Sequence, residues 1–137
     1  MSGGAGEVLV QPFVERLLRD GEWSLVFFAG AFSHAVRKRP APGDFRVQEQ
    51  FGGRTETMPV PASLIADAGR VVEAAVVATG LASSRDILYA RVDGVEEEGR
   101  LVLMELECVE PTLFFGYDAG AARRMGDELL SVVAKSE

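Results

Sequence analysis

The feature that most constrains the fold is a pair of β-rich segments, residues 88–96 and 101–109, separated by a glycine at position 99. Both segments are rich in Val and Leu, and a glycine between two such runs is typical of a hairpin turn. Seven of the even-numbered positions are apolar, so this face is expected to pack on a core. Its members are Leu88, Ala90, Val92, Val102, Met104, Leu106 and Cys108.

The odd-numbered face of the same hairpin carries four charged side chains. If the turn centres on Gly99, Asp93 lies opposite Glu105 and Arg91 lies opposite Glu107. Three carboxylates beside one arginine repel one another unless a cation lies among them, and oxygen-only ligands of this kind suit Mg²⁺ or Mn²⁺, usually with a substrate phosphate. The alternative is that these charges cover the solvent face of an antiparallel sheet, with Arg91 and Glu107 paired across strands.

The residues around the hairpin read YARVD at 89–93 and LMELECVEP at 103–111. This text resembles the metal-binding end of ATP-grasp enzymes, the superfamily of D-alanine:D-alanine ligase and glutathione synthetase. In that superfamily an R-x-D strand is followed by an acidic E-x-N, E-x-D or E-x-E strand and then a proline. The resemblance implies bound ATP and Mg²⁺ (or Mn²⁺) in the parent enzyme.

By this resemblance, Arg91 contacts the nucleotide phosphates, and the metal ligands are Asp93, Glu105 and Glu107. The chain departs from the common pattern because Glu107 stands where Asn is most frequent. A further acid, Glu110, precedes the proline, so the identity of the second-strand ligand stays open between Glu107 and Glu110.

Two upstream segments extend the resemblance. Residues 7–14, EVLVQPFV, read as a strand with a proline, which fits an edge or the end of an element. This segment is similar to the superfamily's hinge under the adenine, where Gln11, Pro12, Phe13 and Val14 would bind the base, chiefly through the Pro12 C=O and Val14 N–H. Residues 21–28, GEWSLVFF, look like the G-x-E strand, in which Glu22 would contact the ribose hydroxyls.

Lys38 is the candidate phosphate-binding lysine on the strand that follows. It is one of only two lysines, against twelve arginines, and with Arg91 it is assigned a catalytic role by the resemblance. The alternative is a basic edge strand that discourages aggregation, with Arg37 and Arg39 competing for the role. A two-residue turn at 29–30 would place Glu22 and Lys38 on opposite faces, whereas a three-residue turn would place them on one face; the sequence leaves both open.

The remaining reactive side chains have weaker signals. His34 is the only histidine and has no partners at metal-ligand spacing, which favours a structural role. Cys108 is alone, which excludes a disulfide framework, and is expected to pack as a small apolar side chain. The segment 41–54 reads as a loop around a short strand, in which Arg46 and Arg54 could contact a phosphate or a substrate carboxylate or be ordinary solvated residues.

The composition bounds the class of protein. The 137 residues are expected to form a single domain, 1–137, and the net charge of −7 argues against nucleic acid as a partner. No run is long and apolar enough for a membrane span and no signal peptide is recognised, so the expected location is the cytoplasm.

The expected fold is α+β, an antiparallel sheet with two helices packed on one face and the charged face left open. The first helix, 62–79, is bounded by Pro61 and Gly80, and the second is expected to begin near Asp118 as its N-cap. The expected elements are strands at 7–14, 23–29, 31–39, 45–49, 87–96 and 101–109, and helices at 62–79 and 118–135.

The resemblance covers the C-terminal ATP-grasp subdomain alone, with the N-terminal substrate domain and the first ATP half absent. The first hypothesis is therefore the C-terminal part of an ATP-dependent carboxylate–amine ligase that forms an acylphosphate, inactive by itself, as a truncated gene product, an expressed fragment or one piece of a split protein. The second is a non-catalytic binding or dimerising domain, because an uncovered sheet face and edge favour self-association. A third hypothesis, a magnesium-dependent phosphohydrolase, is weaker, because the sequence contains neither a histidine motif nor a nucleophile motif that would support it. The substrate carboxylate and amine are left open.

Overall fold

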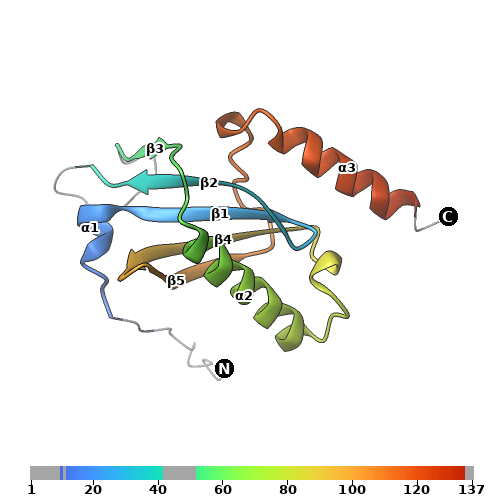
Figure 1. The fold of residues 1–137 in the computed structure, drawn as a ribbon, viewed down its shortest axis with the longest axis horizontal. Coiled ribbons are helices and arrows are strands. Elements are labelled where there is room, and N and C mark those ends of the chain that lie inside the picture. Colours follow the sequence, from blue (N-terminus) through green and yellow to red (C-terminus); the bar gives the residue numbers. More distant parts are fainter. Residues whose placement is uncertain (1–9, 11, 42–51, 135–137) are drawn as a thin grey trace, which may run out of the picture.

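The computed structural model describes residues 10, 12–41 and 52–134. They form an α+β fold built on an antiparallel sheet, as expected from the sequence, and the sheet has five strands in the order β3-β2-β1-β4-β5 (Figure 1). The strands are β1 (Glu22–Phe28), β2 (Ala31–Arg39), β3 (Arg54–Glu56), β4 (Tyr89–Glu97) and β5 (Arg100–Glu107). The α-helices are α1 (Arg16–Asp20), α2 (Ala62–Thr79) and α3 (Ala121–Ala134), with short 3₁₀ turns at Ser84–Asp86 and Phe115–Tyr117.

The β1–β2 hairpin settles the register that the sequence left open. Its turn consists of Ala29 and Gly30, both with positive φ (46° and 80°), as in the type I′ turns that suit tight hairpins. A two-residue turn alone would separate Glu22 and Lys38, but Ser33 is an extra, bulged residue in β2. The bulge shifts the register by one, so that Glu22 pairs directly with Lys38 on one face of the sheet.

The β4–β5 hairpin also combines a two-residue turn with a bulge. Glu98 and Gly99 form the turn, with φ of 51° and 76°, and Met104 is the extra residue of a bulge in β5. Without this bulge, Asp93 would face Met104; with it, Asp93 pairs with Glu105. The predicted cross-strand pairings of the four charged residues are thus confirmed, although the turn has two residues and the bulge supplies the shift.

The bulge also corrects the prediction for the apolar face of this hairpin. Leu106 packs on the main core as expected, but Met104 packs on the opposite face, against Leu17 and Val95. Cys108 lies beyond the end of β5 and is exposed, so its expected burial is wrong. The two faces of a strand alternate strictly only in a regular strand, and the extra residue Met104 interrupts this alternation of side chains in β5.

Helix α2 covers one face of the sheet and encloses the main core. Its bounds are those expected from the sequence, with Pro61 before the first helical residue and Gly80 after the last in the left-handed conformation. The fully buried side chains of the helix face the odd-numbered positions of β1. This core comprises Trp23, Leu25, Phe27, Ala35, Leu64, Ala68, Val72, Ala90 and Val92.

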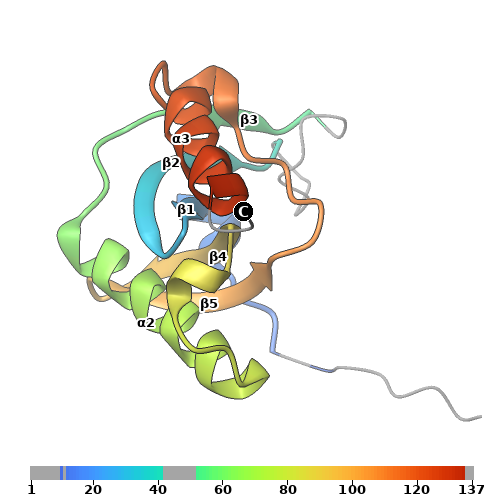
Figure 2. The same ribbon diagram turned by 90° about the vertical axis from the view of Figure 1, so that its right-hand side faces the viewer.

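Helix α3 lies on the other face, which differs from the expected packing of both helices on one side (Figure 2). Its buried Ala121 contacts Val26 and Phe28, the even-numbered positions of β1. Asp118 is not its N-cap: the helix begins at Ala121, and the Asp118 carboxylate accepts hydrogen bonds from the Gly120 N–H (2.9 Å) and the Arg124 side chain (2.7 Å).

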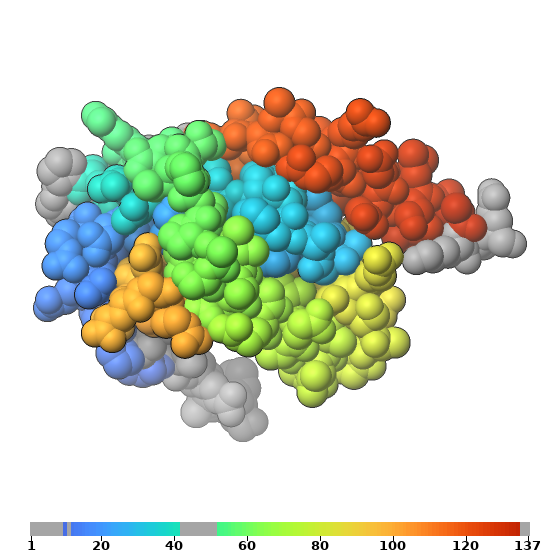
Figure 3. Space-filling model, in the orientation of Figure 1, coloured from blue at the N-terminus to red at the C-terminus, as the bar shows by residue number. Residues whose placement is uncertain are grey.

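Only the first turns of α3 are packed. Its C-terminal half extends away from the sheet (Figure 3), and Leu130 and Val133 are 69% and 60% exposed. Helix α1 covers the far end of the same face, where Leu17 packs on Val95. The middle of this face, between α1 and α3, carries the charged side chains.

The N-terminal prediction is wrong where it can be compared. Residues 7–9 and Gln11 lie outside the described residues, and Val10 and residues 12–14 are not in a strand; among the described residues, the first regular element is α1. The expected strand at 45–49 also lies outside the described residues, as does Arg46, while β3 at Arg54–Glu56 was not predicted. No helix within the described ranges is long and apolar enough to cross a membrane.

Candidate nucleotide and metal site

Asp93, in the middle of β4, is the centre of the charged face. It is 2% exposed, and its Oδ1 accepts a hydrogen bond of 2.6 Å from the hydroxyl of Ser24, which pairs with it across β1 and β4. Burial of an aspartate at this depth requires charged or hydrogen-bonded partners, because an isolated buried carboxylate is strongly destabilising. Ser24, Arg91 and Lys38 supply them.

The guanidinium of Arg91 is the main partner of Asp93. Nε lies 3.0 Å from both carboxylate oxygens and Nη2 lies 2.8 Å from Oδ2, a bidentate arrangement. Nη2 also pairs with Glu107, and Nη1 donates to the backbone carbonyl of Thr112 at 3.4 Å. Burial opposes the charge on Arg91, yet the hydrogen bonds with Asp93 and the neighbouring carboxylates outweigh it and raise the pKa of the guanidinium.

A second ion pair lies beside the first. Lys38 Nζ is 2.6 Å from Glu22 Oε2 and 3.6 Å from Asp93 Oδ2, and all three side chains are nearly inaccessible to solvent. Burial raises the pKa of Glu22, and this effect is larger than the opposing effect of the Lys38 ammonium. The bulge in β2 therefore brings Lys38 to the face that carries Glu22, Arg91 and Asp93, where the four side chains form a connected network.

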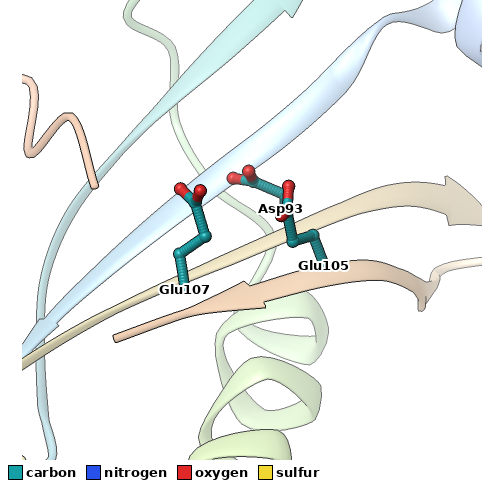
Figure 4. A group of neighbouring side chains, drawn as sticks. All are labelled: Asp93, Glu105 and Glu107. Carbon is teal, nitrogen blue, oxygen red and sulfur yellow. The ribbon is translucent and has the colours of Figure 1, made fainter. Parts of the chain in front are cut away.

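The three predicted metal ligands converge from β4 and β5 (Figure 4). One carboxylate oxygen each from Asp93, Glu105 and Glu107 lies within 4.8 Å of the others. Ligands of an octahedral Mg²⁺ lie about 3.0 Å apart when adjacent and about 4.2 Å apart when opposite, so the three carboxylate oxygens would have to draw closer together around an ion. Together with Glu22, these ligands make four carboxylates, against the two cations Lys38 and Arg91. The group therefore has two negative charges in excess, which one divalent ion neutralises. The residues present therefore fit Mg²⁺ or Mn²⁺.

The structure does not group Glu110 with these ligands. It follows the end of β5, is exposed and has a φ of +56°. Of the hinge candidates, Val14 packs beside Leu17 and Val95 at the α1 end of the same face, whereas Phe13 is 59% exposed. Gln11 lies outside the described residues, and Pro12 is exposed.

Several residues of the site were not predicted. Ser24 is two positions after Glu22, so strand periodicity could have identified it as a neighbour on the same face. Thr112 and Phe114 carried no such signal, because they belong to an irregular segment. The Phe114 ring lies over the Arg91 guanidinium, 6.0 Å from its centroid, and its backbone has a φ of +50°.

His34 holds this segment in place. One ring nitrogen lies 2.8 Å from the Leu113 carbonyl and the other 2.9 Å from the Ser33 hydroxyl, which also accepts from Arg124 Nε of α3 at 2.9 Å. Burial lowers the pKa of His34 below its ordinary value. Both ring nitrogens have partners, which agrees with the expected structural role, and the bulged Ser33 thus links β2 to α3.

Comparison with known proteins identifies similar chains. The chain is 30% identical over 127 residues to the cycloserine biosynthesis protein DcsG of Streptomyces lavendulae, covering 89% of this chain and 41% of that protein. The crystal structure of the D-cycloserine synthetase DcsG matches with a TM-score of 0.74 at 30% identity, over 87% of this chain and 40% of that one. No protein-family model matches the chain.

A D-alanine–D-alanine ligase from Bacillus anthracis, crystallised with ATP, matches with a TM-score of 0.50 at 23% identity, over 83% of this chain and 36% of the ligase. At that identity the likeness concerns the fold alone. The resemblance to the ATP-grasp superfamily expected from the sequence is thus confirmed in sequence and in fold. The chain spans about two fifths of the length of the relatives it matches.

Proposed function

We propose that this chain, an ATP-grasp-like part of a ligase, is the C-terminal ATP- and Mg²⁺-binding part of an ATP-dependent carboxylate–amine ligase. The parent enzyme would activate a carboxylate as an acylphosphate, and an amine would then displace phosphate. The observation that supports this most directly is the convergence of Asp93, Glu105 and Glu107 beside Arg91 and Lys38, on a chain 30% identical to a D-cycloserine synthetase. A cytoplasmic location stays part of the proposal.

Each side chain has an assigned role in this proposal. Asp93, Glu105 and Glu107 hold the metal, which when bound neutralises phosphate charge and orients the transferring group. Arg91 and Lys38 are the catalytic cations that contact the phosphates, and Glu22 accepts hydrogen bonds from the ribose hydroxyls. Gln11, Pro12, Phe13 and Val14 are proposed to border the adenine, with recognition through backbone groups.

The isolated chain is proposed to bind ATP weakly and to lack ligase activity. Enclosed ligand sites bury roughly 70–90% of a ligand's surface, and a chain of about two fifths of its relatives' length would supply one side of the nucleotide site. The rest would come from a missing N-terminal half, which also would select the small-molecule carboxylate and amine. Homodimerisation is the other way in which the open face could be covered.

Calorimetric titration of Mg²⁺-ATP into the wild-type chain and an Asp93→Asn/Glu105→Gln double variant tests the proposal. Binding to the wild-type chain should be detectable, and the double variant should lose its magnesium-dependent part while keeping the fold. An Asp127→Asn/Glu128→Gln variant is the matched control, because it removes the same charge from α3, where Asp127 pairs weakly with Arg123 at 4.0 Å. Equal magnesium-dependent affinity in all three chains would refute the metal assignment.

A further inference from the structure

We infer that Arg91 is a built-in counter-ion that occupies the metal-binding carboxylates until a polyphosphate draws it away, so that metal and nucleotide bind this site cooperatively. The inference rests on the proposed function, since it concerns the regulation of the same site. It is carried by the donors that face both carboxylate oxygens of Asp93, by the contacts that hold Arg91, and by the charges in the cluster.

Both carboxylate oxygens of Asp93 face donors in the present arrangement, and the Arg91 guanidinium spans the two. A carboxylate offers about four lone-pair directions, two on each oxygen. Oδ1 accepts from Ser24 Oγ at 2.6 Å and from Arg91 Nε at 3.0 Å. The same Nε–H is shared with Oδ2 at 3.0 Å, and Oδ2 also accepts from Arg91 Nη2 at 2.8 Å and lies 3.6 Å from Lys38 Nζ. A metal therefore reaches Asp93 only if Arg91 leaves it.

Glu107 is occupied in the same way, because its carboxylate pairs with Nη2 of Arg91. Of the three proposed ligands, Glu105 is the one that no described hydrogen bond or salt bridge engages. A divalent ion arriving alone would thus meet one available carboxylate and a neighbouring guanidinium of like charge. Both conditions weaken metal binding.

The segment after β5 holds Arg91 in this position. The Thr112 carbonyl accepts from Nη1, and the Phe114 ring lies over the guanidinium. The left-handed backbone of Phe114, at φ +50°, is an uncommon conformation for a non-glycine residue. His34 anchors the segment between these two contacts through the Leu113 carbonyl. Arg91 is therefore held by this segment as well as by the carboxylates of Asp93 and Glu107.

A polyphosphate is the ligand that can draw Arg91 away from these carboxylates. The planar guanidinium matches phosphate oxygens in the same bidentate manner as a carboxylate, so Arg91 exchanges one anionic partner for another. The exchange frees Asp93 and Glu107 for the metal that accompanies the phosphates. By linkage, whatever the polyphosphate adds to metal affinity, the metal adds to polyphosphate affinity.

Binding of Mn²⁺ alone, followed by electron paramagnetic resonance without nucleotide, tests the inference on the whole chain. The wild-type chain should bind Mn²⁺ weakly, and an Arg91→Gln variant should bind it roughly tenfold more tightly or better, within the range common for coupled sites. Arg123→Gln is the control, since it removes one positive charge from an exposed position on α3 and should leave Mn²⁺ affinity unchanged.

Phe114→Leu provides a second variant that keeps Arg91 and the apolar bulk of the segment. Removal of the ring should loosen the guanidinium and raise Mn²⁺ affinity by a smaller factor, and this variant carries the test if Arg91→Gln fails to fold. Equal Mn²⁺ affinity in the wild-type and variant chains would overturn the counter-ion role and leave the metal site standing. No Mn²⁺ binding by any of the chains would overturn the metal site along with it.

Discussion

Removal of the Arg91 side chain should destabilise the metal-free chain strongly. Asp93 is 2% exposed and would lose a bidentate partner, and breaking a buried ion pair by removing one member typically destabilises by about 3–5 kcal/mol. Ser24 at 2.6 Å and Lys38 at 3.6 Å remain to compensate part of the charge, so the lower end of the range is expected. We therefore expect Arg91→Gln to lower the free energy of unfolding by about 3 kcal/mol.

A double-mutant cycle in urea, followed by circular dichroism, measures this coupling. Asp93→Asn removes the buried charge that needs Arg91, so the Arg91→Gln/Asp93→Asn chain should be more stable than the sum of the single effects by about 1–3 kcal/mol. The exposed Arg123→Gln control should stay within about 0.5 kcal/mol of the wild-type chain. A loss below about 1 kcal/mol for Arg91→Gln, or strict additivity in the cycle, would refute the view that Asp93 depends on Arg91.

The remaining predictions concern other parts of the structure. Ser24→Ala should destabilise by about 1.5–3 kcal/mol, because it removes a hydrogen bond to a buried charge, and Ser24→Thr should restore most of the stability measured in urea. The lowered pKa of His34 means that its neutral form is favoured in the folded chain, so the corresponding stability is present above its ordinary pKa of 6.5 and is lost as the pH falls through the pKa of the folded chain. Proton NMR should show the lowered pKa, and acid unfolding should show the loss of stability. A free energy of unfolding that stays constant across this pH window would contradict the prediction. Gly94→Ala should destabilise by about 1–3 kcal/mol, since an added Cβ would lie 2.7 Å from a backbone carbonyl of β5, while Gly69→Ala in α2, where nothing lies within 4 Å, should stabilise by about 0.5–1 kcal/mol; thermal melts showing the same sign for both would contradict the packing assigned to them.

The local elements followed from short-range sequence signals. Pro61 and Gly80 mark the ends of α2 because one residue fits the first turn of a helix and the other adopts the left-handed conformation after its last turn. The β4–β5 hairpin followed from the apolar segments and the turn glycine, whereas the predicted pairing of Asp93 with Glu105 depends on the bulge at Met104. The segments YARVD and LMELECVEP indicated the resemblance to the superfamily, since that resemblance depends on residue type and spacing.

Long-range packing decided the rest. The bulge at Ser33 places Glu22 with Lys38 and the bulge at Met104 places Asp93 with Glu105, and no local pattern marks where an extra residue enters a strand. Helix α3 lies opposite α2 because Val26 and Phe28 offer an apolar end to a face whose middle is charged, a surface that exists only once the sheet has formed. Asp93 meets Ser24 across two strands, and Arg91 meets Thr112 and Phe114 of an irregular segment, and these contacts depend on the folded chain. The sequence by itself determined which charged residues the chain carries, whereas the tertiary structure determined which side chains each of them contacts.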